Sequence, residues 1–452
     1  MKKNKYLPIV AAILILVFSV NDYSLWIDEM QTYGIVFESD FFKTLSTIWN
    51  TTGSVGGMPL FFILEWFWTQ LFGYSEIAMR SINIPFAIVY FIFSYKIIRY
   101  VKEPTWLCLL FFFNPLFIYY MNEARPYIML LCMGSVFSYL LFCCDTNRYK
   151  TLFWLHVSFL IGLLTHMMFG FIIILYITHC ITSIRQRKLM LQQHLVMGSA
   201  FLLPYFAVLY HYGNVMIGAA ELGGTGELSA GGLSSIAQIV YYLAGFGGLA
   251  LSRNDLRAMM LSHLSIEHVV FSILLIAGYF TLFLYILKNK AGKNNAIQTL
   301  FLPALITLGV FCISNIILET RFWERHVIYL LPVILLSLCT ILKAMSASGK
   351  WLYRIGAGLI VISLFVSSFN TMFNQYYRKE NYKAVAACIK DMGAGTFLLQ
   401  GDAQIYSYYG INVDEKQVLM INNISIEELD AIVMAKYPPP PCIPCTFKQA
   451  RI

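Results

Sequence analysis

The hydrophobic pattern of the chain is a series of long apolar runs separated by short polar segments. Most runs approach the length that a helix needs to cross a bilayer, roughly 17 to 25 residues, and none shows the alternation of a membrane β-barrel. The pattern predicts an all-α polytopic membrane protein with about eleven transmembrane helices. The expected spans are residues 6–20, 81–100, 105–120, 127–144, 152–165, 167–184, 195–212, 268–287, 299–318, 327–342 and 352–369.

Composition supports this class, because 58% of the 452 residues are hydrophobic and only 12% are charged. The mean hydropathy of +0.66 is higher than a soluble domain of this length can accommodate. The net charge of +8 comes largely from lysines and arginines in the short loops between spans, where they act as topology signals. We therefore expect the lipid bilayer as a partner and no nucleic acid.

The N-terminus is expected to stay in the cytoplasm. Lys2, Lys3 and Lys5 precede the first apolar run, and acidic residues follow it. The run also resembles the core of a signal peptide, but no small-residue cleavage site follows, which favours an uncleaved anchor. The loop at residues 21–80 then lies outside.

The segment Met58–Phe72 decides the rest of the topology. It is short for a span and carries Glu65 between aromatic residues. If it crossed the membrane, the basic clusters of the later loops would all face outside, against the usual bias. We therefore expect an amphipathic helix along the outer interface, with Glu65 either on a solvated face or in the site. For the same reason, Ile236–Leu251 is expected at the interface or as a re-entrant segment within a long outer loop at 213–267.

Beyond the last span the polar content becomes ordinary. We expect a transmembrane catalytic domain at 1–372 and a small extracytoplasmic α/β domain at 373–452, with a helix at Tyr382–Lys390 and a strand at Thr396–Leu399. The tail Pro438–Cys445 is typical of extended polyproline. Its C-x-x-C spacing has no second cysteine pair, which disfavours a redox or metal role.

With this topology, ionisable side chains collect on the outer face of the protein. Asp28 and Glu29 form an adjacent pair after the first span, a costly place for charge. Arg125 and Arg325 are candidate phosphate ligands, because guanidinium groups bind phosphate through paired hydrogen bonds and stay charged near lipid. The other candidates for the site are Glu65, Glu123, His166 and His326.

Each candidate has a structural alternative. The acidic pair can simply mark the membrane boundary, and the two arginines can snorkel or pair with neighbouring glutamates. His166 at a hairpin tip is typical of a capping residue, and His326 of an aromatic belt. The sequence contains no P-loop, H-E-x-x-H or G-x-S-x-G motif, so nucleotide hydrolysis and zinc or serine hydrolase chemistry have no motif support.

Several of these segments resemble a known family, the polyprenyl-phosphate-sugar-dependent glycosyltransferases of the GT-C fold. Within that fold, the segments look like those of the dolichyl-phosphate-mannose–protein mannosyltransferase family (glycosyltransferase family 39) with its bacterial relatives. The similar segments are Leu25–Glu29, Met58–Phe62, Leu71–Arg80, Asn114–Leu116, Asn122–Tyr127, Glu324–His326 and Leu331–Pro332. Two positions depart from the family pattern. No basic residue or histidine precedes Pro59, which leaves the donor-phosphate contact of that loop open, and His326 stands where a tyrosine is usual.

The resemblance implies transfer of a sugar from a polyprenyl-phosphate donor to an acceptor glycan, lipid or protein, with inversion, on the outer face of a bacterial inner membrane. Asp28 would be the general base, with Glu29 as the alternative, and Arg125 and Arg325 would hold the departing phosphate. Glu123, Tyr127, His166, His326 and Glu65 would line the substrate site. We expect no cofactor, although two adjacent carboxylates are also able to bind a divalent metal.

Two other functions remain open from the sequence. One is a flippase or transporter of lipid-linked saccharides, which should carry polar residues through the bilayer midplane. Span centres such as Phe86–Phe93 and Val333–Leu338 are almost free of such residues, which favours the enzyme. The other is an O-antigen-type ligase or polymerase, which would use a diphosphate-linked donor.

Overall fold

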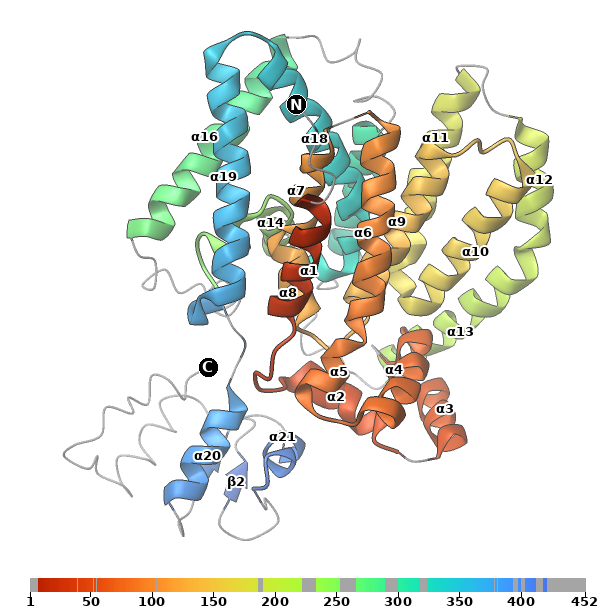
Figure 1. Cartoon of the computed structure of the whole chain (residues 1–452). Helices are drawn as coiled ribbons and strands as arrows, with labels where there is room; N and C mark the ends of the chain where they lie inside the picture. The colour runs from red at the N-terminus through yellow and green to blue at the C-terminus, as the bar shows by residue number, and fades with distance from the viewer. Residues whose placement is uncertain are drawn as a thin grey trace. The chain divides into compact units, whose positions relative to one another are not determined.

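The structure is a computed structural model (Figure 1). It describes residues 7–38, 40–51, 53, 55–102, 104–185, 190–221, 233–252, 266–288, 300–317, 323–377, 379, 381–392, 397–399, 403–411 and 418–420. The chain divides into two compact units. Unit 1 contains Met1–Asn21 and Ile35–Tyr377, and unit 2 contains Asp22–Gly34 and the residues from Arg378 onward. The expected domains had assigned residues 22–34 to the transmembrane part, whereas here they belong with the C-terminal unit.

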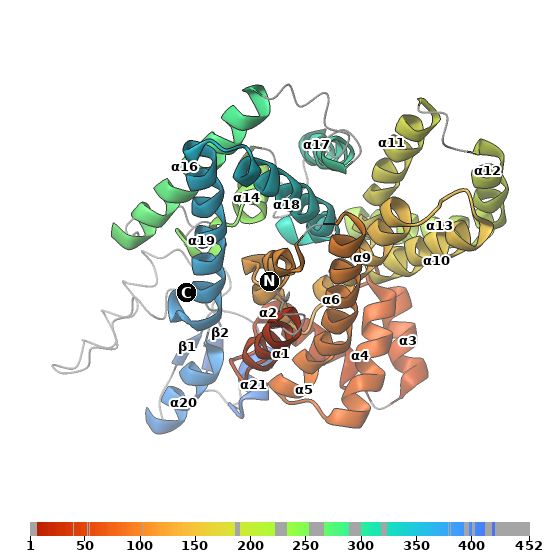
Figure 2. The same cartoon turned by 45° about the horizontal axis from the view of Figure 1, so that its top comes forward.

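Among the described residues, unit 1 is built from helices (Figures 1 and 2). Its α-helices include α1 (Leu7–Ser19), α3 (Phe41–Asn50), α4 (Pro59–Phe72), α5 (Glu76–Ser81), α6 (Asn83–Tyr100), α7 (Cys108–Phe112), α8 (Pro115–Met121), α9 (Tyr127–Cys143), α10 (Tyr149–Thr165), α11 (Ile172–Arg185), α12 (Leu191–Ala200), α13 (Leu202–Glu221), α14 (Leu233–Leu243), α16 (Ile266–Lys288), α17 (Leu302–Ile317), α18 (Leu331–Ala347) and α19 (Trp351–Phe373). Short 3-10 helices are η1 (Thr105–Leu107), η2 (Met167–Phe171), η4 (Phe246–Gly248), η8 (Glu324–Leu330) and η9 (Gln375–Tyr377).

Within the described residues, five helical segments are long and apolar enough to cross a membrane, and α12 with α13 makes a sixth if that bent pair is one span. Shorter apolar helices occupy Pro8–Ser19, Tyr127–Cys143, Tyr149–Thr165 and Leu302–Ile317. The architecture is that of an all-α polytopic membrane protein, as the apolar runs predict. The helix α4 is not among the segments able to span.

Two expected spans are not continuous helices. The run at 105–120 breaks between α7 and α8, because Pro115 starts a new helix and the Asn114 side chain caps it by accepting from the Leu116 N–H at 3.0 Å. The run at 195–212 bends by 56° between α12 and α13. Both breaks lie inside apolar stretches. A hydropathy average over such a stretch does not detect a local break in the helix.

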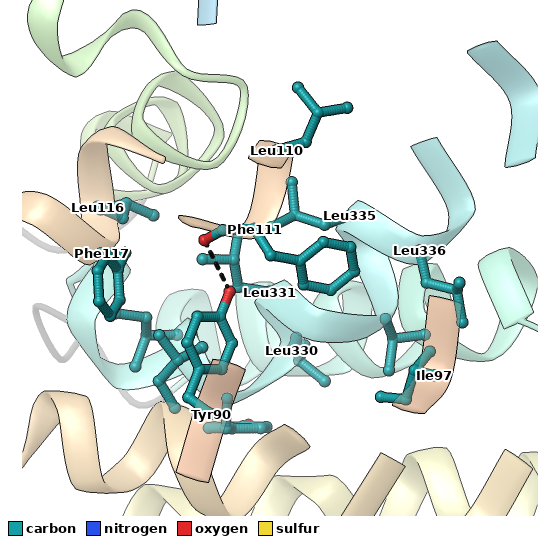
Figure 3. Packing of buried hydrophobic residues seen from close by; sticks show 14 of the residues in the cluster. Tyr90, Ile97, Leu110, Phe111, Leu116, Phe117, Leu330, Leu331, Leu335 and Leu336 are labelled. Carbon is teal, nitrogen blue, oxygen red and sulfur yellow. Dashed lines mark hydrogen bonds between the residues drawn. The ribbon is translucent and has the colours of Figure 1, made fainter. Parts of the chain in front are cut away.

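The core of unit 1 packs around α6, α8 and α18 (Figure 3). Tyr90, Phe111 and Phe117 are fully buried there, and the Tyr90 Oη donates to the carbonyl oxygen of Phe111 at 3.1 Å. The Tyr90 hydroxyl therefore satisfies a carbonyl near the end of the short helix α7, where the helix leaves such groups without partners. This core fixes the ends of α8 and η8, which carry polar side chains described below.

A close helix contact also holds η8 in place. Gly134 of α9 faces the backbone of Tyr329, and a Cβ built on Gly134 would lie 2.3 Å from the Tyr329 carbonyl oxygen. Real Cβ atoms essentially never approach a backbone oxygen so closely. Only glycine therefore permits this approach of α9 to η8.

We expect Gly134→Ala to destabilise the protein by about 1–3 kcal/mol, the usual effect of overpacking a tight contact. The matched control is Gly309→Ala in α17, where a Cβ would meet nothing within 4 Å. That control should be neutral or slightly stabilising, because alanine has the higher helix propensity. Thermal unfolding in detergent measures both, and equal midpoints for the two variants would contradict the packing described.

Unit 2 combines two separate parts of the sequence. Its first part includes most of α2 (Ile27–Val36), and its second includes α20 (Tyr382–Met392), α21 (Ala403–Tyr408), β1 (Phe397–Leu399) and β2 (Val418–Met420). The two short strands pair in parallel, with Phe397 opposite Val418. The expected helix and strand of the C-terminal part are present, and the proline-rich tail with Cys442 and Cys445 lies outside the described residues.

Candidate functional site

The loop between α8 and α9 carries two of the predicted site residues and is held by one amide side chain. Asn83, at the start of α6, donates from Nδ2 to the carbonyl oxygens of Tyr120 at 3.4 Å, Met121 at 3.2 Å and Glu123 at 2.6 Å. The first two carbonyls lie in the last turn of α8, and the third lies in the loop that follows it. A single buried amide therefore fixes how the chain leaves α8 and enters the loop.

Arg125 follows in a tight turn, with its N–H donating to the Glu123 carbonyl at 2.8 Å. Both side chains are buried, and Arg125 is only 2% exposed. The Arg125 Cζ lies 5.9 Å from the ring centroid of Phe62 on α4. The guanidinium stays charged in proteins, so this loop places a permanent cation in a buried setting.

His166 lies at the joint between α10 and η2 and has two different ring nitrogens. Its Nδ1 accepts from the Met168 N–H at 3.1 Å and so caps η2, as a hairpin-tip histidine is expected to do. This bond assigns the proton to Nε2, a buried nitrogen with no hydrogen-bond partner among the described residues. The capping role is confirmed, and a second nitrogen remains as a donor.

The electrostatic surroundings keep His166 neutral. Burial, together with repulsion from Arg125 and Arg325, lowers its pKa from 6.5 to about 3, and burial is the largest of these causes. A positive charge on this ring would be placed in a desolvated region beside two permanent cations. At neutral pH the ring is therefore an uncharged N–H donor close to two guanidinium groups.

This pKa shift predicts how stability depends on pH. Because the folded-state pKa is below the unfolded value, the unfolded chain takes up a proton as the pH falls below 6.5 and the folded chain does not. As the pH falls from about 8 to 5, the titration of His166 should therefore lower the free energy of unfolding by about 2 kcal/mol. His166→Asn, whose side chain still caps a helix, should lose this part of the pH dependence in thermal unfolding. Identical pH profiles for wild type and variant would contradict the shift.

The segment at η8 supplies the second arginine and a histidine. His326 Nδ1 accepts from the Trp323 N–H at 3.1 Å, which fixes the start of η8. Glu324 is buried, and its Oε1 accepts from the Tyr120 hydroxyl at 2.6 Å. The Arg325 Cζ lies 5.4 Å from the ring centroid of Tyr127, in range for a cation–π contact.

The three segments meet through their rings. Tyr127 lies 6.3 Å from His166 and 4.8 Å from Tyr120, and His166 lies 5.3 Å from His326, measured between ring centroids. The loop before α4 joins them, because the Met167 N–H donates to the Gly57 carbonyl at 2.9 Å. The structure therefore brings together Glu123, Arg125, Tyr127, His166, Arg325 and His326, which come from three distant parts of the sequence.

Glu65 was expected either on a solvated helix face or in the site, and the structure contradicts the first of these. The side chain is 0% exposed, so the solvated helix face is wrong. Glu65 lies on α4 close to one turn beyond Phe62, the residue that contacts Arg125. Burial of the carboxylate follows from the packing of α4 against α10 and α3, which covers the side that an isolated interfacial helix would leave open.

The acidic pair lies at the start of α2 in unit 2, and its two members differ. Glu29 is 0% exposed, and its Oε2 accepts from the Trp26 N–H at 3.3 Å. This is the glutamate half of a capping box, which satisfies a backbone N–H at the helix start. Asp28 is half-buried. Thus Glu29 has a structural task at the helix start.

Sequence reasoning missed three residues that shape this region. Asn83 and Tyr120 lie in or beside apolar runs and read as span residues, although a buried amide in such a run is itself a sign of a specific partner. Glu324 was noted only as a neighbour of Arg325. A small cavity borders its contact with Tyr120, and the cavity is lined by Pro115, Leu116, Tyr119, Tyr120, Tyr242, Gly247, Glu324 and Thr371.

Chemically, the site in unit 1 is suited to an anion. The buried Arg125 and His166 and the half-buried Arg325 gather in one region, and guanidinium and N–H groups bind phosphate oxygens by charge-assisted hydrogen bonds. Among the described residues, no group of three or more histidine, cysteine, aspartate or glutamate side chains is arranged to hold a metal ion.

Comparison with known proteins identifies the fold. No protein-family model and no curated protein matches the sequence. Among solved structures, ArnT from Cupriavidus metallidurans, a GT-C glycosyltransferase, is similar at a TM-score of 0.50 and 10% sequence identity, both in its apo state and bound to undecaprenyl phosphate. The two alignments cover 95% and 94% of this chain and 87% of ArnT. This likeness shows the fold, so the expected GT-C fold is confirmed.

Proposed function

We propose that this protein is a membrane glycosyltransferase that moves a sugar from a polyprenyl-phosphate donor to an acceptor hydroxyl. The main observation behind the proposal is that Arg125 and Arg325 both lie close to the neutral N–H donor His166, in a chain with the GT-C fold. A lipid-linked donor suits a membrane enzyme, because its tail stays in the bilayer and its phosphate stays at the interface. The structure of ArnT bound to undecaprenyl phosphate, which has the same fold, supports this donor class.

In the proposed reaction, the acceptor oxygen attacks the anomeric carbon from the side opposite the phosphate. The bond between that carbon and the phosphate oxygen breaks, and polyprenyl phosphate leaves with the electron pair. Negative charge then grows on the phosphate, and Arg125 and Arg325 stabilise that charge. His166 donates an uncharged N–H to a phosphate oxygen, and attack from the opposite side inverts the anomeric centre.

Asp28 is the proposed general base. It takes the proton of the acceptor hydroxyl as the new carbon–oxygen bond forms, which balances the reaction. Glu29 maintains the start of α2 through its bond to the Trp26 N–H, and Asp28 lies one residue before it. The resemblance implies Asp28 as the base with Glu29 as the alternative, and the capping bond of Glu29 supports that order.

The proposed assignments of the remaining residues follow from their positions. Glu123 fixes the turn that presents Arg125, and Tyr127 lies under Arg325. His326 and Glu65 complete the surroundings of the phosphate. The proposed reaction uses no cofactor, and transfer measured with and without a chelator tests this directly.

We further propose that the site faces the extracytoplasmic side of a bacterial inner membrane, with the N-terminus in the cytoplasm. The basic residues of the loops after α6, α11, α16 and α18 support this orientation. Reporter fusions after Lys102 and after Gly73 test it: the first should report the cytoplasm and the second the outside. The reverse result would overturn the orientation.

The function itself is tested by offering the purified protein three donors of the same sugar: a polyprenyl monophosphate, a polyprenyl diphosphate and a nucleotide diphosphate. Transfer to an extract of envelope acceptors should occur with the monophosphate alone. Transfer from the diphosphate lipid would instead identify a ligase or polymerase. Movement of the lipid-linked sugar across vesicles without any transfer would identify a transporter.

A further inference from the structure

The acidic pair and the C-terminal part of the chain belong to one compact unit, although they are more than 350 positions apart in the sequence. We propose that the C-terminal part holds the helix of Asp28 in its working position, and that Tyr409 and Ser24 are positioning residues for the sugar transfer. The inference rests on the proposed function, since it assigns a task to the segment that carries the proposed base.

The first contact is made at the chain just before α2. The Leu25 N–H donates to the Tyr409 Oη at 2.8 Å, and Leu25 is 0% exposed. This N–H lies ahead of the helix, where no α-helical partner exists for it, so the tyrosine hydroxyl satisfies a buried backbone donor. Such a bond fixes where the backbone stands three residues before Asp28.

In the second contact the C-terminal part is the donor, and the segment before α2 is the acceptor. The Lys383 N–H, in the first turn of α20, donates to the Ser24 Oγ at 3.2 Å. First-turn N–H groups have no acceptor within their own helix, so Ser24 supplies one that α20 needs. The Lys383 side chain extends to the same segment, with its Nζ 3.3 Å from the Asp22 carbonyl oxygen.

Aromatic packing continues the contact along α2. The rings of Tyr33 and Tyr408 meet edge to face at 4.9 Å, and the Lys379 Nζ lies 5.2 Å from the ring centroid of Trp26. The Gln404 side-chain oxygen lies near Gly34, where a Cβ would stand 3.4 Å from it. Contacts before and after Asp28 therefore constrain its helix on both sides of that residue.

A base acts within a narrow range of distances from the proton it removes, so a small displacement lowers the rate without changing the binding of a distant part of the substrate. The proposal thus predicts a specific kinetic result. Loss of a contact between α2 and the C-terminal part should lower kcat, whereas the donor KM, which reports on the phosphate ligands of unit 1, should stay unchanged.

The experiment uses the full-length protein with Tyr409→Phe and Ser24→Ala, each of which removes one oxygen with little change of shape. Each variant should lower kcat by about five-fold, the equivalent of one net hydrogen bond, at an unchanged donor KM. The control is Ser407→Ala, an exposed residue on the same helix as Tyr408, which should match wild type. A kcat within two-fold of wild type for both variants, or a parallel rise in donor KM, would overturn the proposal.

A cross-link tests the contact without relying on activity. In the full-length double variant Ser24→Cys with Lys383→Cys, mild oxidation should join the two positions, because the Lys383 N–H and the Ser24 Oγ are in hydrogen-bond contact. Peptide mapping should find this pair, and the oxidised protein should transfer sugar faster than the same variant when reduced, because the disulfide replaces the lost contact between the two segments. Absence of the cross-link would overturn the contact. A cross-link in a protein that transfers no sugar even as wild type would instead show that the proposed function has failed.

Discussion

Asp28→Asn should abolish most of the sugar transfer while leaving the donor bound. Removal of a general base lowers kcat by about 10²- to 10⁴-fold, and asparagine keeps the size and helix-start preference of the aspartate. The donor affinity should not change, because the proposed phosphate ligands are Arg125, Arg325 and His166. The measurement is initial-rate kinetics with a polyprenyl-monophosphate sugar, together with direct binding of polyprenyl phosphate.

The control for this variant is Asp40→Asn in the same loop. Asp40 caps α3 by accepting from the Phe42 N–H at 2.8 Å, a bond that asparagine also forms. The Asp40→Asn variant should therefore transfer sugar at the wild-type rate. Glu29→Gln tests the choice of base: the amide oxygen still accepts from the Trp26 N–H, so a rate loss larger than that of Asp28→Asn would make Glu29 the base and contradict the assignment.

Arg125→Gln and Arg325→Gln should each lower kcat/KM for the donor by about 10²- to 10³-fold, the size of effect seen when one group that stabilises developing charge is removed. Lysine at either position should recover only part of the loss, because an ammonium group lacks the two parallel donors of a guanidinium. Kinetics with varied donor concentration measures the effect.

Arg148→Gln is the matched control for the two arginines. Arg148 is an exposed residue whose Nε lies 3.3 Å from the Asp145 carboxylate, and it precedes α10. Because exposed ion pairs contribute little, this variant should be indistinguishable from wild type. If it lost as much activity as Arg125→Gln, the effect would reflect general loss of positive charge and not a phosphate site.

The sequence predicts the fold class and most helices, because each long apolar run has few alternatives in a membrane. Its failures have local causes. The break at Asn114 and Pro115 is a helix-start pattern that an average over an apolar window does not register. The burial of Glu65 depends on which helices pack against α4, and no periodicity within α4 contains that information.

The candidate site was predicted in a similar, partial way. Charged residues at loop ends are visible in the sequence, so Arg125, His166 and Arg325 were found, and the structure brings them together. Asn83 was missed because its role depends on carbonyl groups about 40 positions away. The sequence also did not predict that the acidic pair belongs to the same compact unit as the C-terminal part. Contacts between residues hundreds of positions apart produce no local pattern in the sequence. The membrane orientation of the site stays a prediction.

The most direct test of the account follows the donor and the product in one reaction. Wild-type protein is incubated with a polyprenyl-monophosphate sugar of known anomeric configuration and an acceptor preparation, and the released lipid and the glycosylated product are both quantified. We expect one polyprenyl phosphate released for each sugar transferred, with the anomeric centre inverted. Retention of configuration, or transfer that proceeds at the full rate in Asp28→Asn, would contradict the account.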